Sequence, residues 1–207
     1  KNLLEQVSIK KVQALTENQK KYIDTINNSI ITLTASPAGC GKSYISSRLA
    51  IEGLMEQKFK KIIISRPILE CGEKLGHLPG ELTSKMGPIL LPLTDVFLQF
   101  LSKSQLESYQ EEGIIEMCPI AYSRGRTFSD AFIILSEAQN ATLVQLKMFL
   151  SRIGQNSKMV IEGDSLQSDL PQQKINPLEY CIQKLQGIDG IGIVRMENKD
   201  IVRHSII

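Results

Sequence analysis

The chain has 207 residues, of which 42% are hydrophobic and 22% charged; this composition is globular and includes no apolar run near the ~20 residues of a membrane-spanning helix. A net charge of +2 neither demands nor excludes nucleic acid as a partner, so any basic surface has to be local. The four cysteines lie far apart without a Cys-x-x-Cys pair and there are only two histidines, which argues against a structural zinc site and favours free thiols in a reducing compartment.

We expect a cytoplasmic chain without a membrane partner, divided into an N-terminal arm at residues 1–14 and a single domain at residues 15–207. The domain begins with a predicted helix, for which Thr16 can act as the N-cap and Gln19 as the partner in a capping box. This helix has an apolar stripe at helical spacing, made of Tyr22, Ile23 and Ile26.

Residues 35–43, with the sequence Ala-Ser-Pro-Ala-Gly-Cys-Gly-Lys-Ser, lie between a predicted strand at 30–34 and a helical pattern that begins at Tyr44. A strand followed by a glycine-bearing loop and a helix is typical of a P-loop. Its backbone N–H groups and the N-terminus of its helix surround a phosphate. Lys42 would reach the β and γ phosphates, and the Ser43 hydroxyl would ligate Mg²⁺. We predict that the loop contacts a nucleotide through Ser36, Pro37, Ala38, Gly39, Cys40, Gly41, Lys42, Ser43 and Tyr44.

Strands and helices alternate along the rest of the chain. Apolar runs predict strands at residues 61–65, 114–118, 131–135, 158–161 and 191–195. Helical spacing predicts helices after the P-loop and at about 90–101, 104–112, 142–153 and 177–185. This alternation predicts an α/β fold with a mostly parallel sheet that helices cover on both faces. Residues 66–80 are rich in glycine and proline and too long for a simple connection, which favours a functional loop.

Two further motifs follow predicted strands. Ser136 and Glu137 come at the end of the fourth strand; in P-loop NTPases a carboxylate there holds Mg²⁺, and its neighbour polarises the attacking water, the role for which Glu137 is placed. After the fifth strand, Gln167 would sense the γ-phosphate, and Asp164 would contact a metal-bound water or hold the loop of Gln167. The alternatives are a solvated residue that opens the next helix at Glu137, and a plain turn for the second motif.

These motifs, with several further segments, resemble the PhoH family of ATPases, which is related to the catalytic RecA-like domain of superfamily 1 helicases. The resemblance extends from about Leu15 to His204 and is carried by residues 36–43, 65–67, 70, 72–73, 75–80, 121–122, 124–127, 137–140, 147–150, 163–164, 167, 169–171 and 202–204. It implies a RecA-like fold, ATP and Mg²⁺ as cofactors, ATP hydrolysis, a link to single-stranded RNA, and ring-shaped homo-oligomers, a hexamer being one candidate.

Two residues depart from the family pattern. Ser36 replaces the first P-loop glycine, and a small residue there keeps the turn at some conformational cost. Ser136 replaces the aspartate of the family's Asp-Glu-Ala-Gln motif, and its hydroxyl can bind a metal-bound water but carries no negative charge. The predicted metal-binding residues are thus Ser43, Ser136 and Asp164. We expect weaker Mg²⁺ binding than in a relative with aspartate, compensated in part by Glu137 and Asp164.

Gln19 resembles the glutamine that reads adenine ahead of the P-loop in many helicases, because an amide can satisfy the donor and acceptor on the adenine edge together. A capping-box glutamine without contact to the nucleotide is the alternative.

An arginine commonly stabilises the transition state of phosphoryl transfer, and a neighbouring copy in a ring can supply it. Arg203 is the favoured candidate, followed by Arg126 and Arg124, with a surface ion pair as the alternative for each. The predicted catalytic residues are therefore Lys42, Glu137, Gln167 and Arg203.

A nucleic-acid surface is predicted from the same resemblance. Arg66, Lys74 and His77 occupy the long loop that faces the nucleic-acid strand in helicase-like sheets, and Tyr122 would stack on a base. A solvated loop is the alternative, since the net charge is only +2.

The sequence as a whole predicts an oligomeric, Mg²⁺-dependent ATPase coupled to single-stranded nucleic acid. A second hypothesis is a nucleotide-dependent assembly module with little turnover, which Ser136 favours because it lacks the usual charge. A third and weaker one is a metal-dependent ribonuclease, for which the available carboxylates are Glu162, Asp164 and Asp169.

Overall fold

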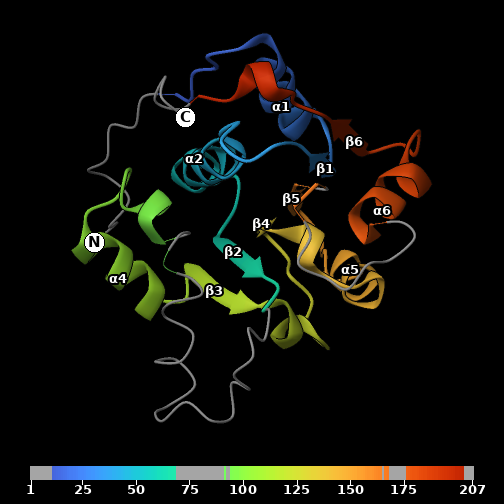
Figure 1. Ribbon diagram of the computed structural model, residues 1–207. Helices are drawn as coiled ribbons and strands as arrows, with labels where there is room; N and C mark the ends of the chain where they lie inside the picture. Colours follow the sequence, from blue (N-terminus) through green and yellow to red (C-terminus); the bar gives the residue numbers. More distant parts are fainter. Residues whose placement is uncertain (1–10, 69–90, 92–93, 165, 168–175, 203–207) are drawn as a thin grey trace.

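Six strands form one sheet, and helices cover both of its faces (Figure 1). The computed structural model describes residues 11–68, 91, 94–164, 166–167 and 176–202. The strands are β1 (Ile31–Ala35), β2 (Lys61–Arg66), β3 (Ile115–Pro119), β4 (Ala131–Leu135), β5 (Lys158–Gly163) and β6 (Ile191–Val194). Their spatial order is β3-β2-β4-β5-β1-β6, and every pairing between them is parallel, which confirms the predicted sheet.

The helices divide between the two faces of the sheet. They are α1 (Glu17–Asn28), α2 (Lys42–Met55), α4 (Lys103–Glu111), α5 (Leu143–Leu150) and α6 (Pro177–Leu185), with short 3₁₀ helices η3 (Ile120–Ser123), η4 (Ala138–Asn140) and η5 (Asn198–Asp200). Buried residues of α1, α2 and α4 share one hydrophobic cluster with the sheet, whereas those of α5 and α6 share the other. Figure 1 shows the two groups on opposite sides of the strands.

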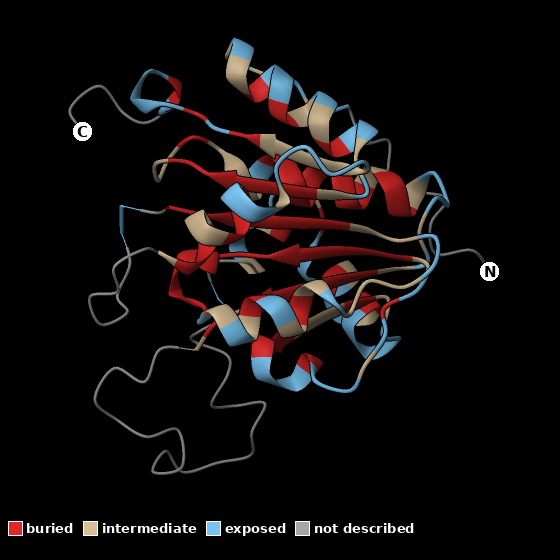
Figure 2. Cartoon of the chain, turned by 90° about the vertical axis from the view of Figure 1, so that its right-hand side faces the viewer, coloured by how far each residue is buried: buried red, intermediate tan, exposed pale blue. Residues whose placement is uncertain are grey.

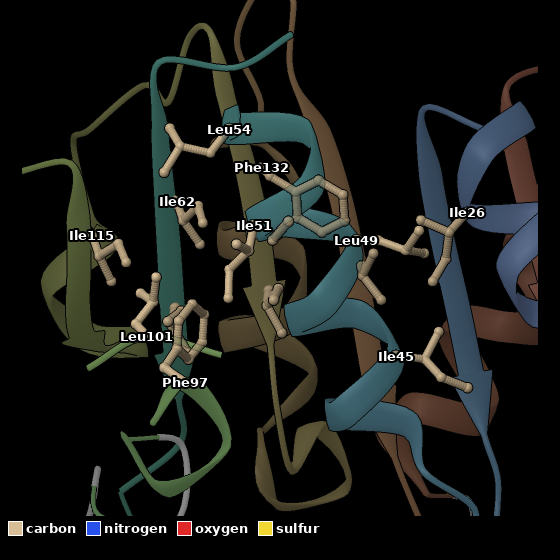
Figure 3. Packing of buried hydrophobic residues seen from close by; sticks show 14 of the residues in the cluster. Ile26, Ile45, Leu49, Ile51, Leu54, Ile62, Phe97, Leu101, Ile115 and Phe132 are labelled. Carbon is tan, nitrogen blue, oxygen red and sulfur yellow. The ribbon is translucent and has the colours of Figure 1, made fainter. Parts of the chain in front are cut away.

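The strands are buried on both faces because their apolar side chains alternate between the two clusters. Along β2, Ile62 and Ile64 belong to the cluster with α2, while Ile63 belongs to the cluster on the other face. Figure 2 shows the buried strands between the helices, and Figure 3 shows Phe97 and Leu101 packed close to Ile62. Continuous apolar runs therefore identify central parallel strands here, as the sequence predicted.

Helix α5 ends earlier than the predicted residue 153. Beyond Leu150, the amide of Phe128 donates to the carbonyl of Arg152 at 2.8 Å, and the amide of Gly154 donates to the carbonyl of Phe128, also at 2.8 Å. These bonds accompany a parallel bridge between Phe128 and Ile153, so the chain leaves the helix to pair with an extended segment. The helix predicted at 90–101 lies partly outside the described residues; within them, helix is found at 91 and 94–97, and turns at 98–100.

The topology brings three strand ends together. β1 lies between β5 and β6, and β5 in turn lies between β1 and β4. Because all three strands are parallel, the P-loop after β1 and the motifs after β4 and β5 emerge at the same edge of the sheet. None of the helices in the described part of the chain combines the length and the apolarity that a membrane span requires.

Candidate functional site

A cavity of about 320 Å³ opens at this edge of the sheet. It is lined by Ala38, Gly39, Gly41, Lys42, Ser43, Tyr44, Ser136, Glu137, Glu162, Gly163, Asp164 and Gln167. The structure therefore brings together the three sequence motifs that were predicted to form one site. Of the predicted P-loop contacts, Ser36 and Pro37 line a second cavity, which shares Asp164 with the first. The side chain of Cys40 is fully buried, and its Sγ donates to the carbonyl of Glu197 at 3.6 Å.

The P-loop presents backbone N–H groups at the start of α2. Gly39 and Gly41 have φ angles of 87° and 78°, in the left-handed region where a Cβ is disfavoured. Gly41 is the N-cap of α2, and a glycine has no side chain with which to cap the first amides of the helix. The first amides of the helix are thus left for another acceptor, and the positive end of the helix dipole favours an anion there.

Lys42 places its ammonium group over this loop. Its Nζ donates to the carbonyl oxygens of Ser36 and Pro37, at 2.7 Å in each case. These two bonds hold the Lys42 side chain across the loop, where Lys42 lines the cavity. A phosphate in the loop would meet both the ammonium charge and the helix amides.

Ser36 keeps the P-loop without the conformational cost that we expected of it. It is not among the residues with positive φ, so the backbone at this position does not require glycine. Its buried hydroxyl lies 2.8 Å from Thr34 Oγ1 and accepts a hydrogen bond from the amide of Met196, also at 2.8 Å. The serine therefore ties the loop to the segment that follows β6.

Replacing Ser36 with glycine is expected to lower the free energy of unfolding by about 1–3 kcal/mol, because the buried amide of Met196 and hydroxyl of Thr34 lose a partner. Denaturant unfolding measures the change. Thr32→Val is the matched control, since Thr32 Oγ1 in the preceding strand β1 is buried without a hydrogen-bond partner among the described residues and its removal is expected to be neutral or stabilising. Equal stability of Ser36→Gly and the wild type would contradict this role for the hydroxyl.

A chain of hydrogen bonds joins the three motifs. Gln139 Nε2 donates to Glu137 Oε2 at 2.6 Å, and Gln139 Oε1 accepts from the amide of Asp164 at 2.9 Å. Asp164 Oδ2 then accepts from the amide of Ala38 in the P-loop at 3.0 Å. Through Gln139 and Asp164, the position of Glu137 is coupled to that of the phosphate-binding loop.

Asp164 holds the turn that carries Gln167. Its Oδ1 accepts from the amide of Leu166 at 3.0 Å, and its own carbonyl accepts from the amide of Gln167 at 3.1 Å. Both carboxylate oxygens are thus engaged with backbone amides. Of the two roles that the sequence left open for Asp164, this geometry supports holding the Gln167 loop.

Glu137 has a backbone conformation that is rare for a residue with a side chain. Its φ and ψ are 55° and 37°, in the left-handed region, at the start of η4. Such conformations cost on the order of 1–3 kcal/mol and persist where the surroundings over-determine them. Here the bond to Gln139 holds the side chain, and the half-buried carboxylate lines the cavity rather than standing in solvent.

Glu162 is the site residue that the sequence analysis missed as part of the P-loop site. It is 1% exposed, and its carboxylate accepts from Ser43 Oγ at 2.5 Å, Ser46 Oγ at 3.0 Å and Tyr22 OH at 3.2 Å. Burial raises the pKa of Glu162 above its ordinary value, while its hydrogen bonds and the charge of Lys42 oppose that rise. The signal in the sequence that could have identified Glu162 is its position, as a charged residue directly after the apolar run of the fifth predicted strand.

Comparison with known proteins identifies the chain. A sequence model of the PhoH-like protein family matches residues 11–207. The chain belongs to the PhoH-like protein family. It is 42% identical over 198 residues to the PhoH-like protein of Bacillus subtilis, covering 96% of this chain and 62% of that protein. It is 38% identical over 197 residues to the protein PhoH of Escherichia coli K12, covering 94% of this chain and 56% of that protein.

This PhoH-like chain thus spans 56–62% of the length of these two relatives. Among solved structures, the helicase domain of Pyrococcus furiosus Hef matches 88% of this chain and 38% of its own, with a TM-score of 0.52 at 13% sequence identity. That likeness confirms the RecA-like fold. Family and fold together show a protein of the P-loop NTPase type.

Gln19 has a structural position in this PhoH-like chain. It is 4% exposed; Gln19 Oε1 accepts from the amide of Leu15 at 2.7 Å, and Gln19 Nε2 donates to the carbonyl of Cys40 at 3.2 Å. Its own amide donates to Thr16 Oγ1 at 3.2 Å, which confirms Thr16 as the N-cap of α1. The predicted capping box is wrong in its second bond, because the side chain of Gln19 binds the amide of Leu15 instead of that of Thr16. The side chain thus links α1 to the P-loop, and its contact with adenine stays a prediction.

The candidate arginines of the PhoH-like pattern have different surroundings. Arg126 forms a two-pronged ion pair with Glu116, with Nη2 2.7 Å from Oε2, and its guanidinium lies 4.8 Å from the ring centre of Phe128. The arginine lowers the pKa of Glu116, and the carboxylate raises that of Arg126. For Arg126 this is the ion pair that the sequence left as the alternative. Arg124 is exposed, and Arg203 lies outside the described residues.

The residues predicted to face nucleic acid are described in part. Arg66 is the last residue of β2 and pairs with Pro119 at the end of β3, directly before η3. Tyr122, in η3, is 49% exposed. Both lie at the sheet edge that carries the cavity, while Lys74 and His77 lie outside the described residues.

No group of three or more His, Cys, Asp or Glu residues that could hold a metal is found within the described part of the chain. The ribonuclease hypothesis therefore gains no support there, and its third carboxylate, Asp169, lies outside that part. A nucleotide-bound Mg²⁺ needs no such cluster, because it keeps several waters and takes oxygens from the phosphates.

Proposed function

We propose that this PhoH-like chain binds ATP with Mg²⁺ and hydrolyses it to ADP and phosphate. The observation that carries the proposal is the single cavity in which the P-loop, the Glu137 carboxylate and the Asp164–Gln167 turn meet. The P-loop NTPase type of the chain, shown by family and fold, supports the same reading.

The P-loop side of the cavity would hold the triphosphate. The amides at the start of α2 and the Lys42 ammonium bind the β and γ phosphates. The hard oxygens of Ser43, Ser136 and Asp164 suit Mg²⁺, and these residues would hold it directly or through water. When bound, the metal neutralises charge that develops on the phosphate oxygens.

Glu137 would act on the water that attacks the γ-phosphorus. Its carboxylate orients the water and accepts its proton, while the bond from the γ-phosphorus to the β–γ bridging oxygen breaks and ADP leaves. The bond from Gln139 fixes the direction of the carboxylate. Gln167, on the turn held by Asp164, would sense the γ-phosphate.

Lys42→Ala is expected to weaken ATP affinity at least about tenfold, because a charge-assisted contact with phosphate is lost. Binding of a fluorescent ATP analogue measures the affinity, and phosphate release measures turnover. Lys103→Ala, which removes an exposed lysine of α4, is the control and should match the wild type. Failure of the wild-type chain to bind ATP would overturn the proposed function.

Nucleic acid and a ring of identical subunits belong to the same proposal. Arg66 ends β2 and Tyr122 follows β3, at the same edge of the sheet as the cavity, where a single strand of RNA would contact charge and an aromatic ring. A neighbouring subunit would then supply the arginine, with Arg203 as the candidate. RNA-stimulated ATP hydrolysis and the native mass test the two parts separately; unchanged hydrolysis and a monomeric mass would remove them.

A nucleotide-dependent assembly module is the second candidate function. Ser136 favours it, because a hydroxyl lacks the negative charge that would help hold Mg²⁺. The two functions share nucleotide binding and differ in turnover. Hydrolysis by the wild type no faster than by a Glu137→Gln variant would favour the module.

A further inference from the structure

We propose that Glu162 provides the buried carboxylate that binds Mg²⁺ through water and Ser43, and thereby replaces the acid absent at position 136. The inference rests on the proposed function, since it concerns the metal that accompanies the nucleotide. It adds Glu162 to Glu137 and Asp164, which we expected to compensate in part for the missing charge at Ser136.

Ser136 and Glu162 are neighbours at adjacent strand ends. β4 and β5 pair in parallel up to Leu135 and Ile161, and Ser136 and Glu162 are the next residues along each strand. Both line the cavity. Since side chains alternate along a strand, Glu162 points to the same face as Val160, the face that α1 and α2 cover. A carboxylate at 162 therefore reaches the region that a carboxylate at 136 would serve.

The contact with Ser43 connects Glu162 to the metal position. Ser43 Oγ donates its hydrogen to Glu162 Oε1 at 2.5 Å. A hydroxyl has one hydrogen and two lone pairs, so this bond leaves the lone pairs of Ser43 for a cation. A metal-ligating serine whose proton is held by a carboxylate is thus already present at the first turn of α2.

The carboxylate is also held in a fixed orientation. Ser46 Oγ and Tyr22 OH both donate to Oε2, at 3.0 Å and 3.2 Å, while the bond from Ser43 goes to Oε1. A carboxylate oxygen accepts about two hydrogen bonds, so Oε1 retains capacity for a water on the metal. The carboxylate of Glu162 is therefore held rigidly through Oε2, while its Oε1 lies towards the nucleotide site beside Ser43.

The other two carboxylates of the cavity are engaged differently. Both oxygens of Asp164 accept backbone amides, and Glu137 is tied to Gln139. Of the three carboxylates that line the cavity, Glu162 is the one with a hydrogen bond to Ser43 in the described structure. Glu162 thus places a carboxylate on β5 next to the position after β4 that Ser136 occupies.

The test is a Mg²⁺ titration of the affinity for a fluorescent ADP analogue, which requires no turnover. Glu162→Gln is expected to raise the Mg²⁺ concentration at half-effect about tenfold, in the range for residues that position metal ligands. Adding Ser136→Asp to Glu162→Gln is expected to restore it, because the charge returns on the neighbouring strand. Glu107→Gln is the matched control, since it removes the same charge from an exposed position of α4; its Mg²⁺ midpoint should match the wild type.

A purely structural Glu162 predicts a different outcome: Glu162→Gln would lose stability without any change in the Mg²⁺ midpoint. That result overturns the inference while the nucleotide still binds, and so leaves the proposed function intact. Ser136→Asp alone decides the question even if Glu162→Gln does not fold. If Glu162 already supplies the carboxylate, the Mg²⁺ midpoint of Ser136→Asp should stay within about twofold of the wild type. A midpoint about tenfold lower than that of the wild type would contradict the inference. Absence of nucleotide binding by the wild type overturns both.

Discussion

Turnover of ATP is expected to fall about 10²–10⁴-fold when Glu137 is replaced by glutamine, while ATP affinity stays near that of the wild type. The amide keeps the size and the hydrogen-bonding shape of the carboxylate, but it cannot accept a proton from the attacking water. Glu137 lines the cavity at the end of β4, so the loss concerns the reacting groups rather than the fold. Single-turnover hydrolysis and equilibrium binding, measured in parallel, separate the two effects.

Glu107→Gln is the matched control, because it makes the same chemical change at an exposed position of α4. It should hydrolyse ATP at the wild-type rate. Retention of turnover within about fivefold by Glu137→Gln would remove this residue from the role of base, since positioned bases contribute at least about 10²-fold.

The strained backbone of Glu137 makes the position of its carboxylate depend on the residues that surround it. A left-handed residue with a side chain is unstable unless its neighbours hold it, and here Gln139 binds the carboxylate directly. Gln139 also accepts the amide of Asp164, whose carboxylate binds the P-loop. A nucleotide that moves the P-loop would therefore also shift Glu137, because hydrogen bonds connect the loop to Glu137 through Asp164 and Gln139.

The sheet and the meeting of the three motifs could be predicted from the sequence because both depend on local patterns. Runs such as residues 62–64 are typical of central strands of a parallel sheet, which are buried on both faces, and a P-loop between strand and helix fixes the edge at which ligands bind. Once the strands are parallel and adjacent, the residues that follow them must share that edge.

Contacts between distant segments could not be predicted in the same way. The sequence predicts a weakened glycine position at Ser36, yet the Ser36 hydroxyl accepts a hydrogen bond from the amide of Met196, which is far along the chain. The partners of Glu162 come from α1 and α2, and nothing at the end of β5 reveals them. The ion pair of Arg126 with Glu116 depends likewise on how η3 and the segment after it fold back on β3.

Gly163→Ala is expected to lower turnover about 10²-fold and the free energy of unfolding by about 1–3 kcal/mol. A Cβ at this position would lie 2.6 Å from Gln139 Oε1, 2.7 Å from Leu178 Cδ2 and 2.9 Å from the backbone nitrogen of Gln139. The added methyl group lies between η4 and the packed side chain of Leu178 in α6, so Gln139 has to move to make room for it. Since Gln139 binds Glu137, the methyl group should displace the carboxylate from the attacking water. Hydrolysis rates and denaturant unfolding measure the two changes.

Gly113→Ala separates the loss of stability from the loss of geometry. Gly113 has a φ of 69°, and no atom of the described residues lies within 4 Å of its missing Cβ, so alanine there strains the backbone far from the cavity. It should destabilise the chain by about 1–2 kcal/mol and leave turnover unchanged. Loss of turnover in Gly113→Ala to the same degree as in Gly163→Ala would mean that activity follows global stability. The coupling of Gly163 through Gln139 to Glu137 would then be wrong.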